Sequence, residues 1–159
     1  MKQQLKNIII VILMVFSFSC VDDNEKDDEI PTIDMTAETA FPQNCSTVYR
    51  GENITFKATF IDNVELGAFS IEIHNNFDHH THSTDITECE MDPIKTPINP
   101  LLFIEEYDIP EGQKSYEALV EVTIPDNVDT GDYHFMVRLT DAAGWQALKG
   151  ISIKIIDRQ

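Results

Sequence analysis

The chain has 159 residues and a formal net charge of −17 at pH 7, from 28 acidic residues against 11 Lys and Arg. A surface this acidic repels phosphate backbones and anionic headgroups, so nucleic acid is excluded as a partner and membrane attachment has to come from a lipid. The part of the chain from about residue 31 to residue 159 has a suitable length for one domain.

Residues 1–19 have the pattern of a lipoprotein signal peptide. Lys2 and Lys6 precede the apolar run "IIIVILMVFSF", which is too short to span a bilayer as a mature helix. The run ends in "SFSC", which resembles a lipobox, although the Ser and Phe at −3 and −2 depart from the usual pattern. A buried helix is the alternative, but the segment has no polar face. We predict that Cys20 is the lipid attachment site and that the chain reaches the membrane through this N-terminal lipid.

Residues 20–30 follow as an acidic tether. The stretch "VDDNEKDDEI" has six acids, one Lys and no aromatic residue, a composition that stays solvated rather than folding. Its position resembles the acidic export signal of surface lipoproteins in Gram-negative bacteria, while a plain spacer is the alternative. We therefore expect an outer-membrane lipoprotein that is exposed at the surface, or one that faces the periplasm.

Residues 31–159 are predicted to form one all-β domain. Apolar and polar residues alternate in several segments, such as "ENITFKATF" and "YEALVEVTI", and this pattern indicates strands with one buried face. Seven strands are expected to begin near residues 31, 52, 65, 101, 114, 132 and 147. An antiparallel β-sandwich is the natural result.

The segment "DTGDYHF" makes the sandwich more specific. Its Asp-x-Gly-x-Tyr order is similar to the tyrosine corner of immunoglobulin-like domains, with Tyr133 as the corner residue. Phe135 occupies the position of the antibody-type cysteine, so the wider immunoglobulin-like or cadherin-like sandwiches are expected rather than an antibody domain.

Two cysteines remain after Cys20. In an exported chain, Cys45 and Cys89 are expected to form a disulfide, because that compartment oxidises thiols. Two thiolate metal ligands are the alternative. Cys89 lies in a long segment between predicted strands, and a disulfide would fix that segment to the region before the second strand.

Four of the five histidines lie in "IEIHNNFDHHTHSTD", residues 71–85. Alternation places His74 on the outer face at the end of the third strand, and it places His134 on the outer face at the start of the sixth. These two strands are antiparallel neighbours in immunoglobulin-like sandwiches, so the fifth histidine is expected beside the other four. In an extended "HHTH", His80 and His82 project to one side and His79 to the other.

The histidines therefore predict a site for zinc or copper, since neutral imidazole is the commonest ligand for such ions. The expected metal ligands are His74, His80, His82 and His134, and the further candidates are His79, Asp78 and Asp85. An ordinary solvated loop is one alternative. Another is a contact surface with Phe77 as its anchor, which would bind an envelope protein or a glycan.

Catalysis is not expected. The chain has no Gly-x-Ser-x-Gly elbow, no Walker loop and no His-Glu-x-x-His, and no catalytic residue is assigned. A zinc-dependent hydrolase that uses a metal-activated water is the weaker alternative.

The segments "FPQNCSTVYRGENITFKATFIDNVELGAFSIEIHNNFDHHTHSTD", "PINPLLFIEEYDIPEG" and "VDTGDYHFMVRLTDAAGWQALKGISIKI" closely resemble the bacterial lipoproteins grouped as domain of unknown function 4625. Its most specific parts are "NNFDHHTHS" and the two cysteines. The resemblance covers nearly everything after residue 31, and it implies a lipid-anchored envelope protein with an immunoglobulin-like sandwich. It implies no activity.

Overall fold

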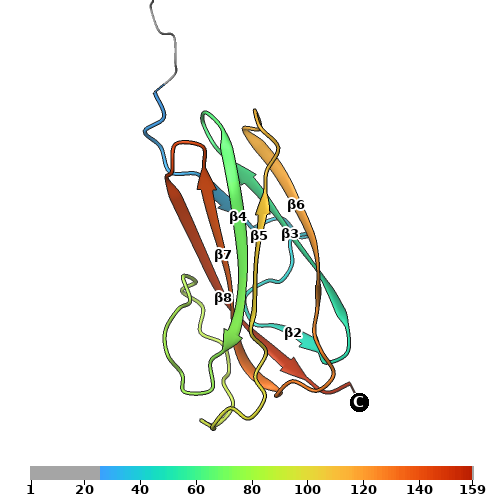
Figure 1. Cartoon of the computed structure of the whole chain (residues 1–159). Helices are drawn as coiled ribbons and strands as arrows, with labels where there is room; N and C mark the ends of the chain where they lie inside the picture. The colour runs from blue at the N-terminus through green and yellow to red at the C-terminus, as the bar shows by residue number, and fades with distance from the viewer. Residues whose placement is uncertain (1–25, 159) are drawn as a thin grey trace, which may run out of the picture.

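The computed structural model describes residues 26–158, and every helix or strand in that range is a β-strand (Figure 1). The signal peptide, the tether up to residue 25 and the lipid site at Cys20 lie outside the described residues. Within residues 26–158, no helix is long and apolar enough to cross a membrane. The strands are β1 (Thr32–Asp34), β2 (Ser46–Tyr49), β3 (Asn53–Ile61), β4 (Leu66–Asn75), β5 (Phe103–Asp108), β6 (Ser115–Thr123), β7 (Gly131–Asp141) and β8 (Gln146–Ile156).

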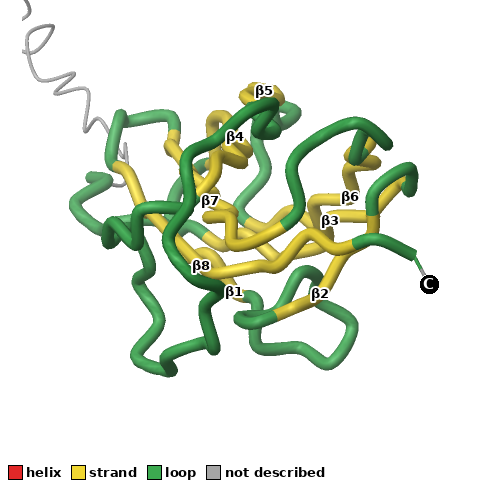
Figure 2. Tube along the Cα trace, turned by 90° about the horizontal axis from the view of Figure 1, so that it is seen from below, coloured by secondary structure: helices red, strands yellow, loops and turns green. Residues whose placement is uncertain are grey.

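The strands form two sheets, which confirms the predicted all-β sandwich. One sheet has the order β1-β3-β6, and the other has the order β2-β8-β7-β4-β5. All pairs are antiparallel except β2 with β8. Figure 2 views the molecule from below, where the strands are seen nearly end-on and the loops of that end lie towards the reader.

Two strands differ from the sequence-based expectation. β2 was not predicted, because its four residues bury only Val48 and so show no repeated alternation. The strand predicted near residue 101 is β5, and immunoglobulin order would place it in the sheet that contains β6. It pairs instead with β4, with Ser70 opposite Glu106, because the connection after β4 returns the chain along the same edge. The larger sheet therefore has five strands.

The core lies between the two sheets and consists of the residues that alternation places inward. Phe56 from β3 and Phe135 from β7 belong to opposite sheets, and their rings stack at a centroid separation of 5.6 Å. Both side chains are fully buried. Burying a side chain of this size contributes about 1.5–3 kcal/mol relative to leaving it exposed, so the inward faces of these strands hold the sheets together.

Tyr133 forms the predicted tyrosine corner. Its hydroxyl donates a hydrogen bond of 2.7 Å to the carbonyl oxygen of Asp129 and accepts one of 3.2 Å from the backbone N–H of Leu101. The side chain is fully buried, and this burial is the main reason that the pKa of Tyr133 rises to about 12. The corner thus fastens the start of β7 to the segment before β5.

Replacing Tyr133 with Phe is expected to lower the free energy of unfolding by about 1–3 kcal/mol, because the buried N–H of Leu101 loses its acceptor. The variant should also respond differently to alkaline pH. In the wild type the unfolded phenol ionises near pH 10 while the folded one stays neutral until about pH 12, so stability falls across that window. Urea unfolding at pH 8, 10 and 12 measures both effects. Equal slopes in the two proteins between pH 10 and 12 would contradict the assignment.

The two ends of the sandwich differ in the loops they carry (Figure 1). The turns from β3 to β4 and from β7 to β8 lie at the end where the described chain begins. The long connection from β4 to β5, residues 76–102, lies at the other end. It has no strand of its own and carries three of the histidines.

Candidate metal centre

His74 and His134 are direct cross-strand partners. The pairing of β4 with β7 places the two residues opposite each other, and their ring centroids are 5.4 Å apart. Phe135 and Ile73, which flank them in the chain, point into the core, so both imidazoles emerge on the outer face of the larger sheet. This is the juxtaposition that alternation predicts.

The connection after β4 brings His80 and His82 onto this pair. The six ring-centroid separations among the four histidines lie between 4.8 and 5.4 Å. Nitrogens of His74, His80 and His82 lie within 4.8 Å of one another, and this set does not include His134. His74 Nε2 is 3.2 Å from His82 Nδ1, which is also a hydrogen-bonding distance. Two nitrogens bound to one tetrahedral zinc at about 2.0–2.1 Å are separated by about 3.3 Å. The closest nitrogen pair is therefore already spaced for a shared ion.

Three of the rings contact an oxygen atom with one of their two nitrogens. His80 Nδ1 is 2.5 Å from Asp78 Oδ1, and His134 Nε2 is 3.0 Å from the carbonyl oxygen of His80. His74 Nδ1 is 2.9 Å from Glu72 Oε1, although the angles of a hydrogen bond are not met. Because these oxygens act as hydrogen-bond acceptors, we assign the N–H of each ring to the nitrogen that faces the oxygen.

The opposite nitrogen of each of these rings then carries a lone pair. A ligating histidine typically donates its second N–H to a carboxylate or a carbonyl in this way. The nitrogens left for a metal are His74 Nε2, His80 Nε2 and His134 Nδ1. His134 Nδ1 is buried and has no hydrogen-bond partner among the described residues.

Burial keeps two of the rings neutral. His134 is 2% exposed, and burial lowers its pKa, which the hydrogen bond to the His80 carbonyl opposes and the neighbouring imidazoles reinforce. Burial also lowers the pKa of His74, with Glu72 acting in the opposite direction. Both imidazoles are therefore neutral at pH 7, which is the form that binds a metal.

The other candidate ligands lie outside this group of four. His79 has a φ of 60°, and its Nε2 is 2.9 Å from the carbonyl oxygen of Asp92. Asp85 accepts the backbone N–H of Thr87 at 3.0 Å and forms an ion pair of 3.7 Å with Lys149. Asp78 contacts the group through His80 rather than through a second ring.

Phe77 is not an exposed anchor, so that prediction was wrong. Its side chain is 3% exposed, and its ring packs edge-on against Tyr133 at 5.3 Å between centroids. Lys95 Nζ covers the other side, 4.3 Å from the ring centroid. Phe77 extends the core beneath the connection because the chain turns inward directly after β4.

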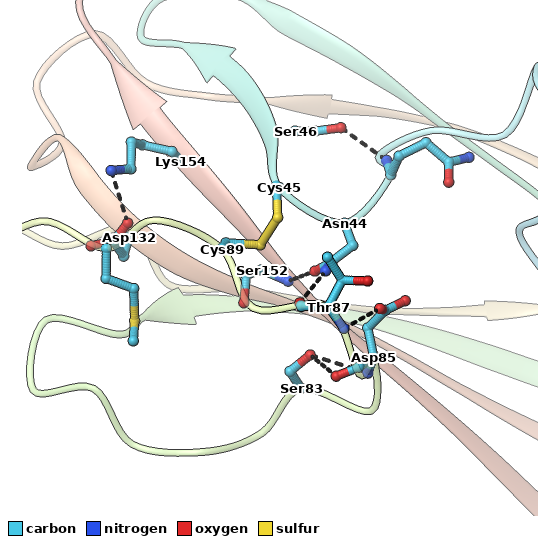
Figure 3. Close-up of a disulfide and its surroundings, with 12 residues drawn as sticks. Asn44, Cys45, Ser46, Ser83, Asp85, Thr87, Cys89, Asp132, Ser152 and Lys154 are labelled. Atoms are coloured by element: carbon cyan, nitrogen blue, oxygen red, sulfur yellow. Dashed lines mark hydrogen bonds and ion pairs between the residues drawn. A yellow bond between two sulfur atoms is a disulfide. The ribbon is translucent and has the colours of Figure 1, made fainter.

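A disulfide joins Cys45 to Cys89, as the cysteine count predicts, and its sulfurs are not available as separate thiolate ligands. It fixes the connection to the segment before β2 (Figure 3). Asn44 reinforces the attachment, since its Nδ2 donates to the carbonyl oxygen of Thr87 at 2.8 Å and its Oδ1 accepts the backbone N–H of Ser152 at 3.0 Å. The histidine-bearing connection is thus held against β8.

Gly150 allows this close approach, which was not predicted from the sequence. A Cβ at this position would lie 2.2 Å from the carbonyl oxygen of His82. Thr84 bonds the same residue in both directions, with its N–H donating to the Gly150 carbonyl at 2.8 Å and its Oγ1 accepting the Gly150 N–H at 3.0 Å. A glycine inside a strand often marks such an approach of another backbone, and that was the available signal.

The four rings can be reached from two hollows. His74 and His82 line a hollow of about 640 Å³, and Arg138 lies on its wall. His80 and His134 line a second hollow of about 360 Å³. An ion or a small ligand can therefore approach the histidines without unfolding of the sandwich.

Comparison with known proteins adds a family assignment. No curated protein matches the chain. Among solved structures, a family 123 glycoside hydrolase from Clostridium perfringens matches with 12% sequence identity and a TM-score of 0.46. That match covers 82% of this chain and 28% of the hydrolase. The sequence model of the domain of unknown function DUF4625 matches residues 18–156, so the chain belongs to the DUF4625 family.

Proposed function

We propose that this protein binds one transition-metal ion, zinc or copper, through His74, His80, His82 and His134. The observation that carries the proposal is the mutual packing of four imidazoles at centroid separations of 4.8–5.4 Å. Imidazole nitrogen suits both ions, and a tetrahedral set is the usual geometry for zinc. The role is binding rather than catalysis.

The outer contacts favour a metal over ordinary ring packing. Four neutral rings that pack only against one another would each need a partner for both nitrogens. His134 Nδ1 is instead buried without a partner, and unsatisfied buried groups of this kind cost about 1–3 kcal/mol. A metal ion bound by that nitrogen would remove the cost.

We also propose that a lipid on Cys20 anchors the chain to the outer membrane. A diacylglycerol on that residue would anchor the chain, and the acidic stretch after it would carry the sandwich away from the bilayer, at the cell surface or on the periplasmic side. In either compartment the Cys45–Cys89 disulfide persists, because the surroundings are oxidising.

Isothermal titration of the purified chain with zinc and with copper tests the proposal. We expect saturable binding of one ion per chain, and binding should weaken as the pH falls, because protons compete with the metal for imidazole nitrogen. Prior treatment with a chelator supplies the metal-free starting protein. A flat titration with both ions at micromolar concentration would refute a metal-binding function.

A second candidate function is adhesion to an envelope protein or a glycan. Exposed apolar side chains lie on the same connection, and they include Ile86 at 98% exposure and Ile98 at 91% exposure. Large apolar side chains that are this exposed would suit a contact with a partner surface. Adhesion of this kind would continue after chelation, whereas a function that depends on the metal would not.

A further inference from the structure

Three carboxylates meet at the end of the sandwich opposite the histidines. Asp62 follows β3, Asp141 is the last residue of β7, and Asp27 belongs to the segment before β1. One oxygen from each lies within 4.8 Å of the others. Two turns and the incoming N-terminal segment therefore bring one negative charge each to the same place.

In Asp62 and in Asp141, one carboxylate oxygen accepts hydrogen bonds from the backbone and the other does not. Asp62 Oδ2 accepts the backbone N–H groups of Val64 at 2.8 Å and Glu65 at 2.7 Å. Asp141 Oδ1 accepts those of Gly144 at 2.7 Å and Trp145 at 2.8 Å. Each aspartate thus closes its own turn with one oxygen. The same hydrogen bonds fix the direction of the second oxygen.

The second oxygens are buried and unpartnered. Asp62 is 6% exposed and Asp141 is 3% exposed, and no donor in residues 26–158 reaches Asp62 Oδ1 or Asp141 Oδ2. Both oxygens of Asp27 likewise lack a well-formed hydrogen bond. Partial burial, followed by the charges of Asp62 and Asp141, raises the pKa of Asp27, which the Glu29 amide opposes only in part. Buried like charges with no donor require a cation or a proton.

We propose that Asp27, Asp62 and Asp141 bind a calcium ion that clasps the N-terminal segment to the end of the sandwich. Carboxylate oxygen is the ligand of hard cations, and Ca²⁺ tolerates the mixed mono- and bidentate geometry that three aspartates offer, with waters completing its six to eight ligands. This site is independent of the histidines, because imidazole is a ligand of transition metals instead.

The single tryptophan of the chain is a built-in reporter for this site. Trp145 donates its backbone N–H to Asp141, and its ring N–H lies 3.4 Å from the carbonyl oxygen of Asp27. Tb³⁺ replaces Ca²⁺ at oxygen sites and emits when a nearby indole is excited. We therefore expect saturable Tb³⁺ luminescence on excitation of Trp145 in the purified full chain, and excess Ca²⁺ should displace it.

Variants locate the ion. Asp27→Asn removes a charge without touching either turn, and it should weaken Tb³⁺ and Ca²⁺ binding by about tenfold or more. Asp62→Asn keeps one amide oxygen for its turn and should weaken binding similarly. Asp28→Asn is the matched control, because it removes the same charge from an exposed neighbour and should bind like the wild type. Ca²⁺ should also raise the melting temperature of the wild type and of Asp28→Asn, but not that of Asp27→Asn.

Three results would overturn the proposal. One is luminescence that does not saturate. Another is equal affinity in Asp27→Asn and Asp28→Asn. The third is loss of Tb³⁺ binding in His74→Ala, which would place the ion among the imidazoles at the opposite end.

Discussion

Removing the Cys45–Cys89 disulfide is expected to lower the free energy of unfolding by about 4 kcal/mol. The two cysteines are 44 residues apart, and in the chain-entropy model a loop of that length costs the unfolded state roughly this much conformational freedom. The folded chain would change little, since Asn44 and Thr84 still hold the connection to β8 by hydrogen bonds. The loss therefore arises mainly in the unfolded ensemble.

Urea unfolding of the Cys45→Ser/Cys89→Ser double variant measures this effect. A reducing agent should destabilise the wild type to the level of the variant and leave the variant itself unchanged, which separates the loss of the disulfide from the effect of the serine side chains. A double variant as stable as the oxidised wild type would contradict the expected restriction of the unfolded chain by the disulfide.

His74→Ala and His134→Ala are each expected to weaken zinc or copper binding by about 100-fold or more. Replacing an outer-shell partner of a metal ligand typically costs 10–100-fold, and removal of a ligand should exceed that range. His134 is buried, so its loss also leaves a cavity, whereas His74 is only partly buried. Agreement between the two variants therefore points to ligand loss rather than to loosened packing.

The matched control for these variants is His79→Asn. His79 is an adjacent loop histidine that contacts Asp92 rather than the four rings, and asparagine tolerates its positive φ. We expect wild-type affinity for this variant in isothermal titration.

The metal affinity of Asp78→Asn should lie between that of the wild type and that of the ligand variants, with about a tenfold loss. In this variant His80 keeps its metal-facing nitrogen but loses the carboxylate that orients the ring. A His79→Asn protein that fails to bind would mean that the ligand set has been chosen wrongly.

The sequence carried enough information to bring His134 to His74. Alternation along β4 and β7 fixed which side chains point outward, and the tyrosine corner at Tyr133 identified β7 as the strand that pairs with β4 in sandwiches of this kind. Both signals are local: the alternation repeats every two residues, and the corner is a short motif around one tyrosine, so a single sequence reveals them.

Other features depend on contacts between distant segments and leave no local pattern. The alternative of a contact surface placed Phe77 at the surface as its anchor, yet the turn after β4 carries this residue into the core. The parallel pairing of β2 with β8 joins two segments about a hundred residues apart. Asp27 gave no sign of meeting Asp62 and Asp141, since its place depends on how the N-terminal segment folds over the two turns.

The described chain begins at one end of the sandwich and the four imidazoles lie towards the other, which limits how charges beside the first end act on the rings. Along β7, His134 is seven residues from Asp141, which corresponds to roughly 23 Å of extended backbone. Mobile ions screen charges in water over about 8 Å at physiological salt. A charged surface beside Asp141 would therefore neither concentrate nor repel cations at His134, and the acidic residues close to the imidazoles would act on such ions instead.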